Sequence, residues 1–300
     1  MAPFHHGGCE MKFLGEILSR SLLRRRSGVG RLISAPLISA GMAFTVVCWS
    51  GPQQVHAQDA GRQQQPAAEI NEAHPLAPAL KMAYESREAL KGVQDYDATF
   101  SKRELINGKL KPQVCYVRIR KEPFSVYMKF VKPNEGREVI FVDGQNKNML
   151  LGHETGILSM AGTVSLPIDG PDAMAENRYP ITMLGIHSLL DQVIRQWEAE
   201  AKFGEVEVNF YRNAKLGKDV DVEVIESTHP KPRNQFRFHM TRLFIDKTTR
   251  LPLRVEQYAF PQAQGQTPPL VEEYSYVSLR TNLRLKNIDF SVDNPQYKFK

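Results

Sequence analysis

Few residues in this sequence have the types and spacing that acid–base chemistry requires. Paired carboxylates occur at Glu272-Glu273 and at Asp219/Asp221, and such pairs can exchange protons with a substrate. Glu272 and Glu273 are neighbours in a predicted strand, so their side chains point to opposite faces. Asp219 and Asp221 share a face, but they flank a predicted turn, where acids are normally solvated. We therefore expect no catalytic carboxylate pair.

The histidines and cysteines are equally dispersed. His153-Glu154 lies in a glycine-bounded stretch that is typical of a solvated turn, and His187 falls among core positions of a predicted helix, which indicates a structural histidine. Cys115 sits within an apolar strand, as a buried and inert thiol would. No residues show metal-ligand spacing, a phosphate-binding loop or a nucleophile elbow. We expect no catalytic residue, no metal and no cofactor, and we do not expect an enzyme. A hydrolase that combines His153, Glu154 and a distant acid stays open as an alternative.

The first 57 residues have the pattern of an export signal. Arginines between Arg20 and Arg31 precede an uncharged run, Leu32–Trp49, and Val55-His56-Ala57 supplies the small-x-small pattern that a signal peptidase cleaves. We predict a signal peptide over 1–57, cleaved between Ala57 and Gln58. An uncleaved amino-terminal anchor is the alternative, because the apolar run is nearly long enough to span a bilayer.

Cleavage changes the charge balance. Of 39 basic side chains 33 would remain, and of 33 acidic ones 31, which is a net charge of +2. A nearly neutral protein gives no electrostatic reason to expect nucleic acid as a partner. Removing 57 of 300 residues leaves 243, and Cys115 is then the single cysteine, so no internal disulfide can form. No later segment is apolar enough for a stable transmembrane span.

The elements that would position any site alternate between helical and strand periodicity. Residues 58–74 read as a flexible linker and 75–300 as a single domain. Apolar residues at helical spacing predict a helix from Leu76 to Leu90 that ends at Gly92. The period then changes to two, with a hairpin turn at Asn107-Gly108. Five short strands are expected, around residues 96–100, 114–120, 124–130, 138–142 and 148–151.

The second half repeats this order. Residues 152–180 read as a long loop with one short strand around 158–164, and a helix is expected to open at Pro180 and end at Gly204. Further alternation predicts strands around residues 206–210, 220–224, 236–240, 243–245, 253–258 and 271–279. The fold class is α+β: a curved antiparallel sheet or half-open β-barrel with two main helices packed on its concave side.

Large apolar side chains are unusually frequent on the predicted strands. Most must form an ordinary core beneath the helices. The alternative is a curved sheet whose concave face is incompletely filled, which leaves an apolar groove for a ligand.

Several phrases resemble known exported proteins. Phe244–Glu256 (FIDKTTRLPLRVE), Pro133–Val139 (PNEGREV) and Val142-Asp143-Gly144 are similar to segments of the periplasmic lipoprotein-carrier (LolA-like) superfamily. Phe290–Phe299 (FSVDNPQYKF) resembles the end of an exported bacterial family, domain of unknown function 1571. The resemblance covers 75–299 and implies a half-open antiparallel barrel with helices on its concave side, and binding of lipids or lipoproteins.

These inferences lead to one expectation. The chain is an exported periplasmic or cell-envelope protein that binds a lipid, an acyl chain or a lipoprotein in an apolar groove. A protein-interaction module of the envelope, without a small ligand, is the alternative. The residues expected to line the groove are Phe124, Val126, Met128, Phe130, Val139 and Phe141.

Overall fold

A computed structural model describes residues 71–299 of the chain, and all structural statements below concern that range. The predicted signal peptide, its cleavage site at Ala57/Gln58 and residues 58–70 of the predicted linker lie outside it. The last residues of that linker form a turn in which the His74 N–H donates to the Asn71 carbonyl at 2.8 Å. No helix in this range is long and apolar enough to cross a membrane.

The described elements begin with a helix and continue as two series of strands separated by a second long helix. The first half contains α2 (Ala77–Lys91), β1 (Asp95–Ile106), β2 (Lys109–Arg120), β3 (Ser125–Lys132), β4 (Glu138–Val142), β5 (Met149–His153), β6 (Thr163–Pro167) and α3 (Pro171–Met174). The second half contains α4 (Ile186–Glu200), β7 (Glu207–Leu216), β8 (Val220–Thr228), β9 (Met240–Asp246), β10 (Pro252–Tyr258) and β11 (Leu270–Thr281). Short 3₁₀ helices occur at Asn146–Asn148, Gly156–Ala161, Ile181–Met183 and Asn287–Phe290.

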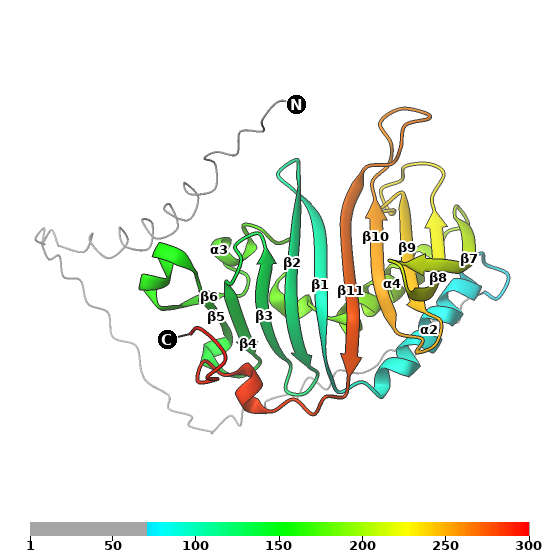
Figure 1. Ribbon diagram of the computed structural model, residues 1–300. Coiled ribbons are helices and arrows are strands. Elements are labelled where there is room, and N and C mark those ends of the chain that lie inside the picture. Colours follow the sequence, from blue (N-terminus) through cyan, green and yellow to red (C-terminus); the bar gives the residue numbers. More distant parts are fainter. Residues whose placement is uncertain (1–70, 300) are drawn as a thin grey trace, which may run out of the picture. The chain divides into compact units, whose positions relative to one another are not determined.

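All the strands belong to one antiparallel sheet. Its order is β6-β5-β4-β3-β2-β1-β11-β10-β9-β8-β7, so each half of the chain forms a meander and the halves join where β1 pairs with β11 (Figure 1). The first strand of one meander thus pairs with the last strand of the other. β6 and β7 do not pair with each other, so the sheet stays open. This confirms the predicted curved, half-open antiparallel sheet.

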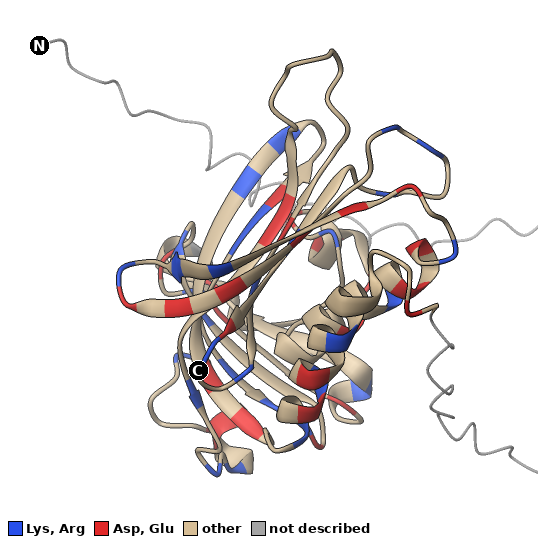
Figure 2. Ribbon diagram, turned by 90° about the vertical axis from the view of Figure 1, so that its right-hand side faces the viewer, with Lys and Arg blue, Asp and Glu red and all other residues tan. Residues whose placement is uncertain are grey.

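The two long helices lie on one face of the sheet, which curves around them (Figure 2). α4 buries a broad apolar stripe that includes Leu190, Ile194 and Trp197, and the Trp197 indole N–H donates to the Ser227 hydroxyl at 3.0 Å. α2 packs beside α4, where the Tyr84 hydroxyl donates to Glu198 at 2.8 Å. Burial of these stripes against apolar strand residues builds the main core on the concave face. The predicted placement of the helices is confirmed.

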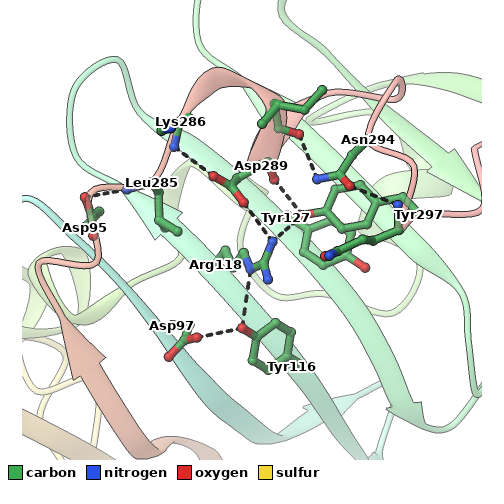
Figure 3. Close-up of polar contacts among 12 residues, drawn as sticks. Asp95, Asp97, Tyr116, Arg118, Tyr127, Leu285, Lys286, Asp289, Asn294 and Tyr297 are labelled. Atoms are coloured by element: carbon green, nitrogen blue, oxygen red, sulfur yellow. Dashed lines mark hydrogen bonds and ion pairs between the residues drawn. The ribbon is translucent and has the colours of Figure 1, made fainter.

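The opposite, convex face is covered by the chain's last segment, residues 283–299. Tyr297 stacks on Tyr127 of β3 with ring centroids 3.9 Å apart, within a second apolar cluster. Arg118 of β2 reaches between this segment and the sheet (Figure 3), and it donates to Asp289 and to the Tyr297 hydroxyl, each at 2.9 Å. Asp95 accepts from the Leu285 N–H at 3.1 Å. The segment therefore forms a second layer on this face.

The structure confirms the features that were predicted from short stretches of neighbouring residues. The helix from Leu76 and its end at Gly92 are observed within one residue. Asn107-Gly108 forms the predicted two-residue hairpin between β1 and β2, with φ of 50° and 75°, the left-handed pair that a type I′ turn requires.

Three predicted boundaries are wrong. The second helix begins at Ile186 and ends at Glu200, rather than at Pro180 and Gly204. Phe236 and Phe238 are buried, but they lie in the loop between β8 and β9, not in a strand. The strand expected around residues 158–164 is Thr163–Pro167, and a 3₁₀ helix precedes it. Phe236 and Phe238 are buried by packing from outside their segment, which local periodicity does not register.

Candidate functional site

The six residues predicted to line a groove share the concave face. Val126, Met128 and Phe130 alternate along β3, and Phe141 of β4 pairs with Val126. All four are buried in the main core, between 0% and 7% exposed. Phe124 and Val139 are half-buried and pack against that core, and the Phe124 and Phe141 ring centroids lie 6.2 Å apart. The structure thus brings the six residues together. Phe124 and Val139 are the two that lie at the partly exposed margin of the main core.

An unfilled position lies beside Val139 on this face. Gly152 of β5 pairs with Val139 on one side and with Val164 of β6 on the other, so all three face the same way. A Cβ built on Gly152 would meet no atom within 4 Å. Side chains at such a strand position normally fill the layer between sheet and covering elements. The space above Gly152, called here the Gly152 hollow, is therefore open.

Further half-buried apolar residues lie on the concave face. They come from β6 and from the segment that leads into α4, and all pack against the main core without being fully covered. These residues are Leu166, Ile168, Ala173, Ile181 and Leu184. Sequence analysis treated Leu166, Ile168 and Ala173 as part of a loop, and it placed Ile181 and Leu184 in the second predicted helix. The signal was present, because Val164, Leu166 and Ile168 alternate with Thr163, Ser165 and Pro167 at strand period.

A charged pair borders the same end of the sheet. Arg137 precedes Val139 by two residues, and its Nε lies 2.6 Å from Glu154 Oε1. The guanidinium also covers the Phe130 ring, with its central carbon 5.2 Å from the ring centroid. Glu176 lies 3.7 Å from the same guanidinium. The apolar hollow thus has a cation at its margin that is already balanced by acids.

A network of buried charges lies further along the concave face. Glu104 of β1 and Glu272 of β11 are cross-strand partners, and both are almost fully buried. Lys102 pairs with Glu104 at 2.7 Å, and Arg178 pairs with Glu272 at 2.6 Å. Burial raises the pKa of Glu272, and Arg178 opposes that rise. Sequence analysis did not place Glu104 beside Glu272, because the partners are far apart in the chain.

Tyrosine hydroxyls complete this network. Tyr274 donates to Glu104 at 2.5 Å, and Tyr179 donates to Glu272 at 2.9 Å. With cation and hydroxyl partners in place, both carboxylates are satisfied and hold the segment that contains Arg178 across the sheet. The arrangement anchors the segment that contains Arg178 to the sheet rather than exposing a reactive group to solvent.

The other predicted carboxylates behave as expected. Glu273 faces the other way from Glu272, toward Arg103 and Arg254. Asp219 is exposed, and exposed Asp221 pairs with Lys215 at 3.0 Å, which lowers the Asp221 pKa.

His153 corrects one expectation. It is not in a solvated turn but is 5% exposed at the end of β5 on the convex face, with its ring centroid 6.0 Å from that of Phe299. Glu154 turns instead to Arg137. The structure therefore does not assemble His153 and Glu154 into one site.

Cys115 and His187 match their predicted roles as core residues. Cys115 is fully buried, and burial raises the pKa of its thiol to about 12. The His187 Nε2–H donates to the Leu90 carbonyl at 3.2 Å, and burial lowers the His187 pKa. Across residues 71–299, no group of three or more His, Cys, Asp or Glu side chains is arranged to hold a metal ion.

Comparison with known families identifies the chain's relatives. The model of the family described as "Protein of unknown function (DUF1571)" matches residues 93–299, which include every strand described above. The chain belongs to the DUF1571 family. This confirms the resemblance inferred from Phe290–Phe299. No curated protein matches the sequence.

Solved structures of similar fold share little sequence with this DUF1571 protein. LprF from Mycobacterium bovis is 14% identical, with a TM-score of 0.41 over 71% of this chain and 98% of that one. A DUF1329 family protein from Desulfovibrio piger is 13% identical, with a TM-score of 0.35 over 73% and 98%. A LolA superfamily protein from Nitrosomonas europaea is 13% identical, with a TM-score of 0.29 over 71% and 97%.

Proposed function

We propose that this DUF1571 protein binds the acyl chain of a lipid or a lipoprotein in the Gly152 hollow. The observation that carries the proposal is the open space above Gly152, on a face that apolar side chains otherwise fill. An unfilled apolar space is costly to leave empty or wet, and an acyl chain can occupy it without needing polar partners.

The walls of the hollow suit a linear apolar ligand. Val139 and Val164 flank Gly152, and each methylene buried between such side chains contributes about 0.8 kcal/mol. Arg137 at the margin is balanced by Glu154 and Glu176, so it offers no unpaired charge to a ligand. A linear apolar chain held by apolar contacts therefore fits this arrangement.

The predicted signal peptide supports a role in the cell envelope. Apolar residues 32–49 behind a basic region would direct the chain across the inner membrane. Lipids and lipoproteins are abundant in that compartment, and the near-neutral charge predicted after cleavage fits a ligand recognised by apolar contact rather than by charge.

The proposed role is binding and not catalysis. Glu104 and Glu272 are engaged by cations and hydroxyls, and His153 and Glu154 lie apart. None of these groups is positioned beside the Gly152 hollow with a free partner atom for proton transfer.

Filling the hollow tests the proposal. Gly152 has strand geometry without a positive φ, so Gly152→Phe can place a ring in the open space without backbone strain. We expect the purified wild-type protein to carry lipid that mass spectrometry detects at stoichiometric amounts, and Gly152→Phe to lose at least about nine-tenths of it.

Gly204→Phe is the matched control. Gly204 is exposed, also has open space around its Cβ position and lacks a positive φ, but it lies beyond the end of α4. Its lipid content should equal that of the wild type. Equal lipid in Gly152→Phe and Gly204→Phe, or none in the wild type, would contradict the proposal.

A protein-interaction role is the second candidate because of one exposed feature. Ile157 and Met160 on the 3₁₀ helix Gly156–Ala161 are 86% and 88% exposed. Residues three apart share one side of a 3₁₀ helix, so the two form a small apolar projection. Crosslinking from this helix to one specific envelope protein, lost in Met160→Asp, would favour this role.

A further inference from the structure

A second cavity lies on the convex face, between the β4–β5 strands and the chain's last segment. Its volume is about 350 Å³, which is at the small end of the range for ligand sites. Most of its lining is apolar: Ile140, Val142, Met149, Leu151, Phe290 and Val292. This is called here the convex cleft.

Arg120 lines the convex cleft, and no acidic side chain within residues 71–299 pairs with it. Arg120 donates from its two terminal nitrogens to Asn287 Oδ1 at 2.8 Å and to Ser125 Oγ at 2.9 Å, both neutral acceptors. Its Nε is buried and has no hydrogen-bond partner within residues 71–299. No ion pair joins Arg120 to a carboxylate in that range, whereas Arg118 on the same strand pairs with Asp289.

Burying such an unpaired guanidinium costs free energy unless an anion lies beside it. A partly buried guanidinium loses hydration, and neutral hydrogen bonds return only part of that loss. The Arg120 guanidinium also lies over the Phe290 ring, 4.9 Å from its centroid, which fixes its plane at the wall of the cleft. The cleft thus combines an oriented, unpaired cation with an apolar floor.

We propose that the convex cleft binds a small amphiphilic acid, with its anionic head at Arg120 and its apolar body on Ile140, Leu151 and Phe290. A carboxylate or a phosphate monoester supplies the shared chemistry, because both present oxygens to a guanidinium. The volume admits a single short chain.

The convex cleft is separate from the Gly152 hollow. Ile140 and Leu151 are cross-strand partners, and they alternate with Val139 and Gly152 along the same two strands. Successive strand residues face opposite sides, so the sheet itself stands between the two sites. A ligand in one site makes no contact with the other.

Isothermal titration of the full-length protein tests this proposal. The probes are octanoate, octyl phosphate, octanol and acetate. We expect octanoate or octyl phosphate to bind, octanol to bind at least tenfold more weakly because it lacks the charge, and acetate to give no detectable heat. The tighter of the two anions identifies whether the head group is a carboxylate or a phosphate.

Substitutions assign the binding to the convex cleft. Arg120→Gln should weaken binding of the tighter anion by tenfold or more, as expected when a charged hydrogen-bond partner is lost. Arg212→Gln, which removes an exposed arginine on β7 at the far end of the sheet, should leave it unchanged. Leu151→Trp should abolish the Arg120-dependent binding by filling the cleft, and Gly152→Phe should leave that Arg120-dependent part unchanged.

Three outcomes would overturn the proposal. Octanoate and octanol could bind equally, which would mean that Arg120 recognises no charge. Gly152→Phe could abolish binding while Arg120→Gln retains it, which would place the probe in the concave hollow. In the third outcome, the folded wild-type protein binds neither octanoate nor octyl phosphate. If circular dichroism shows that Arg120→Gln fails to fold, Arg120→Lys and Leu151→Trp test whether the anion binds in the convex cleft. Unchanged binding of the tighter anion in both variants would overturn the proposal.

Discussion

At the scale of single residues, buried charges are held by partners that the chain brings from other elements. His229 follows β8, and its Nδ1–H donates to the Glu205 carbonyl at 2.8 Å. Its ring stacks on Phe236 with centroids 3.7 Å apart, and its Nε2 lies 3.2 Å from Glu200 Oε2, close enough for an ion pair although not aligned as a hydrogen bond. Phe236, mistaken for a strand residue, is thus buried by this stack.

The His229–Glu200 pair makes stability depend on pH. Burial opposes a charge on His229, but Glu200 and the Glu205 carbonyl outweigh it and raise the His229 pKa above 6.5. A raised folded pKa contributes stability that is fully present below the unfolded value, near 6.5, and is lost as pH rises through the folded value. We expect the contribution of this pair to the free energy of unfolding to fall from about pH 6 upward. The lowered His187 pKa acts in the opposite direction, so urea titrations at several pH values must compare the wild type with a variant of the pair.

Glu200→Gln tests the cause, because it removes the charge while it keeps the side chain's size. The fall in unfolding free energy over this pH range should become smaller than in the wild type. Glu207→Gln removes an exposed carboxylate from β7 and should leave the fall unchanged. An identical pH dependence in wild type and Glu200→Gln would show that another group is responsible.

At the scale of elements, the start of α4 is built by two distant strands. The Gly185 N–H donates to the Tyr276 hydroxyl of β11 at 2.8 Å, and the Ile186 N–H donates to the Tyr96 hydroxyl of β1 at 2.9 Å. Helix starts leave such N–H groups unpaired, and here tyrosines replace the usual local cap. Gly185 has a φ of 111°, and a Cβ there would lie 2.8 Å from the Tyr96 hydroxyl.

Tyr96→Phe should destabilise the protein by about 1–3 kcal/mol, because it leaves the buried Ile186 N–H without a partner while the ring still fills its place. Chemical denaturation measures the change. Tyr211→Phe removes a hydroxyl from a half-exposed tyrosine on β7 and should change the free energy of unfolding by less than about 0.5 kcal/mol. Equal stability of Tyr96→Phe and the wild type would show that the hydroxyl does not cap α4.

These contacts also explain which element boundaries the sequence could predict. Asn107-Gly108 and Gly92 end their elements by local backbone preference, so reading the sequence locates them. The α4 start depends on Tyr96 and Tyr276, which lie about ninety residues away in the chain. A helical pattern that begins at Pro180 therefore overruns the true start by six residues.

At the scale of the whole described unit, one open sheet separates two apolar layers. The helices cover the concave face (Figure 2), and residues 283–299 cover part of the convex face (Figure 3). The two candidate sites lie on opposite sides of the same strands, β4 and β5. Tyr297 is one of the anchors of the convex layer.

Tyr297→Ala should cost about 3–5 kcal/mol, the range for truncating a buried aromatic side chain. It removes the stack on Tyr127 and the hydroxyl that both accepts from Arg118 and donates to the Asp289 carbonyl. Tyr297→Phe keeps the stack and should cost much less. Thermal and urea unfolding measure both changes, and equal losses in the two variants would contradict the importance of the stack.

The sequence by itself determined the α+β class, the hairpin at Asn107-Gly108, the burial of Cys115 and the shared face of Val126, Met128 and Phe130, because each follows from period, local turn chemistry or side-chain polarity. It also indicated the family through Phe290–Phe299.

Tertiary structure alone decided where space is left. Strand register places Gly152 between Val139 and Val164, and Glu104 beside Glu272. Segments that fold back from far along the chain leave Arg120 without an acidic partner among the described residues. Register is set by the packing of every strand at once, so no local pattern contains it. The sequence therefore placed the predicted groove residues on the correct face. The open part of that face lies beside them, above Gly152.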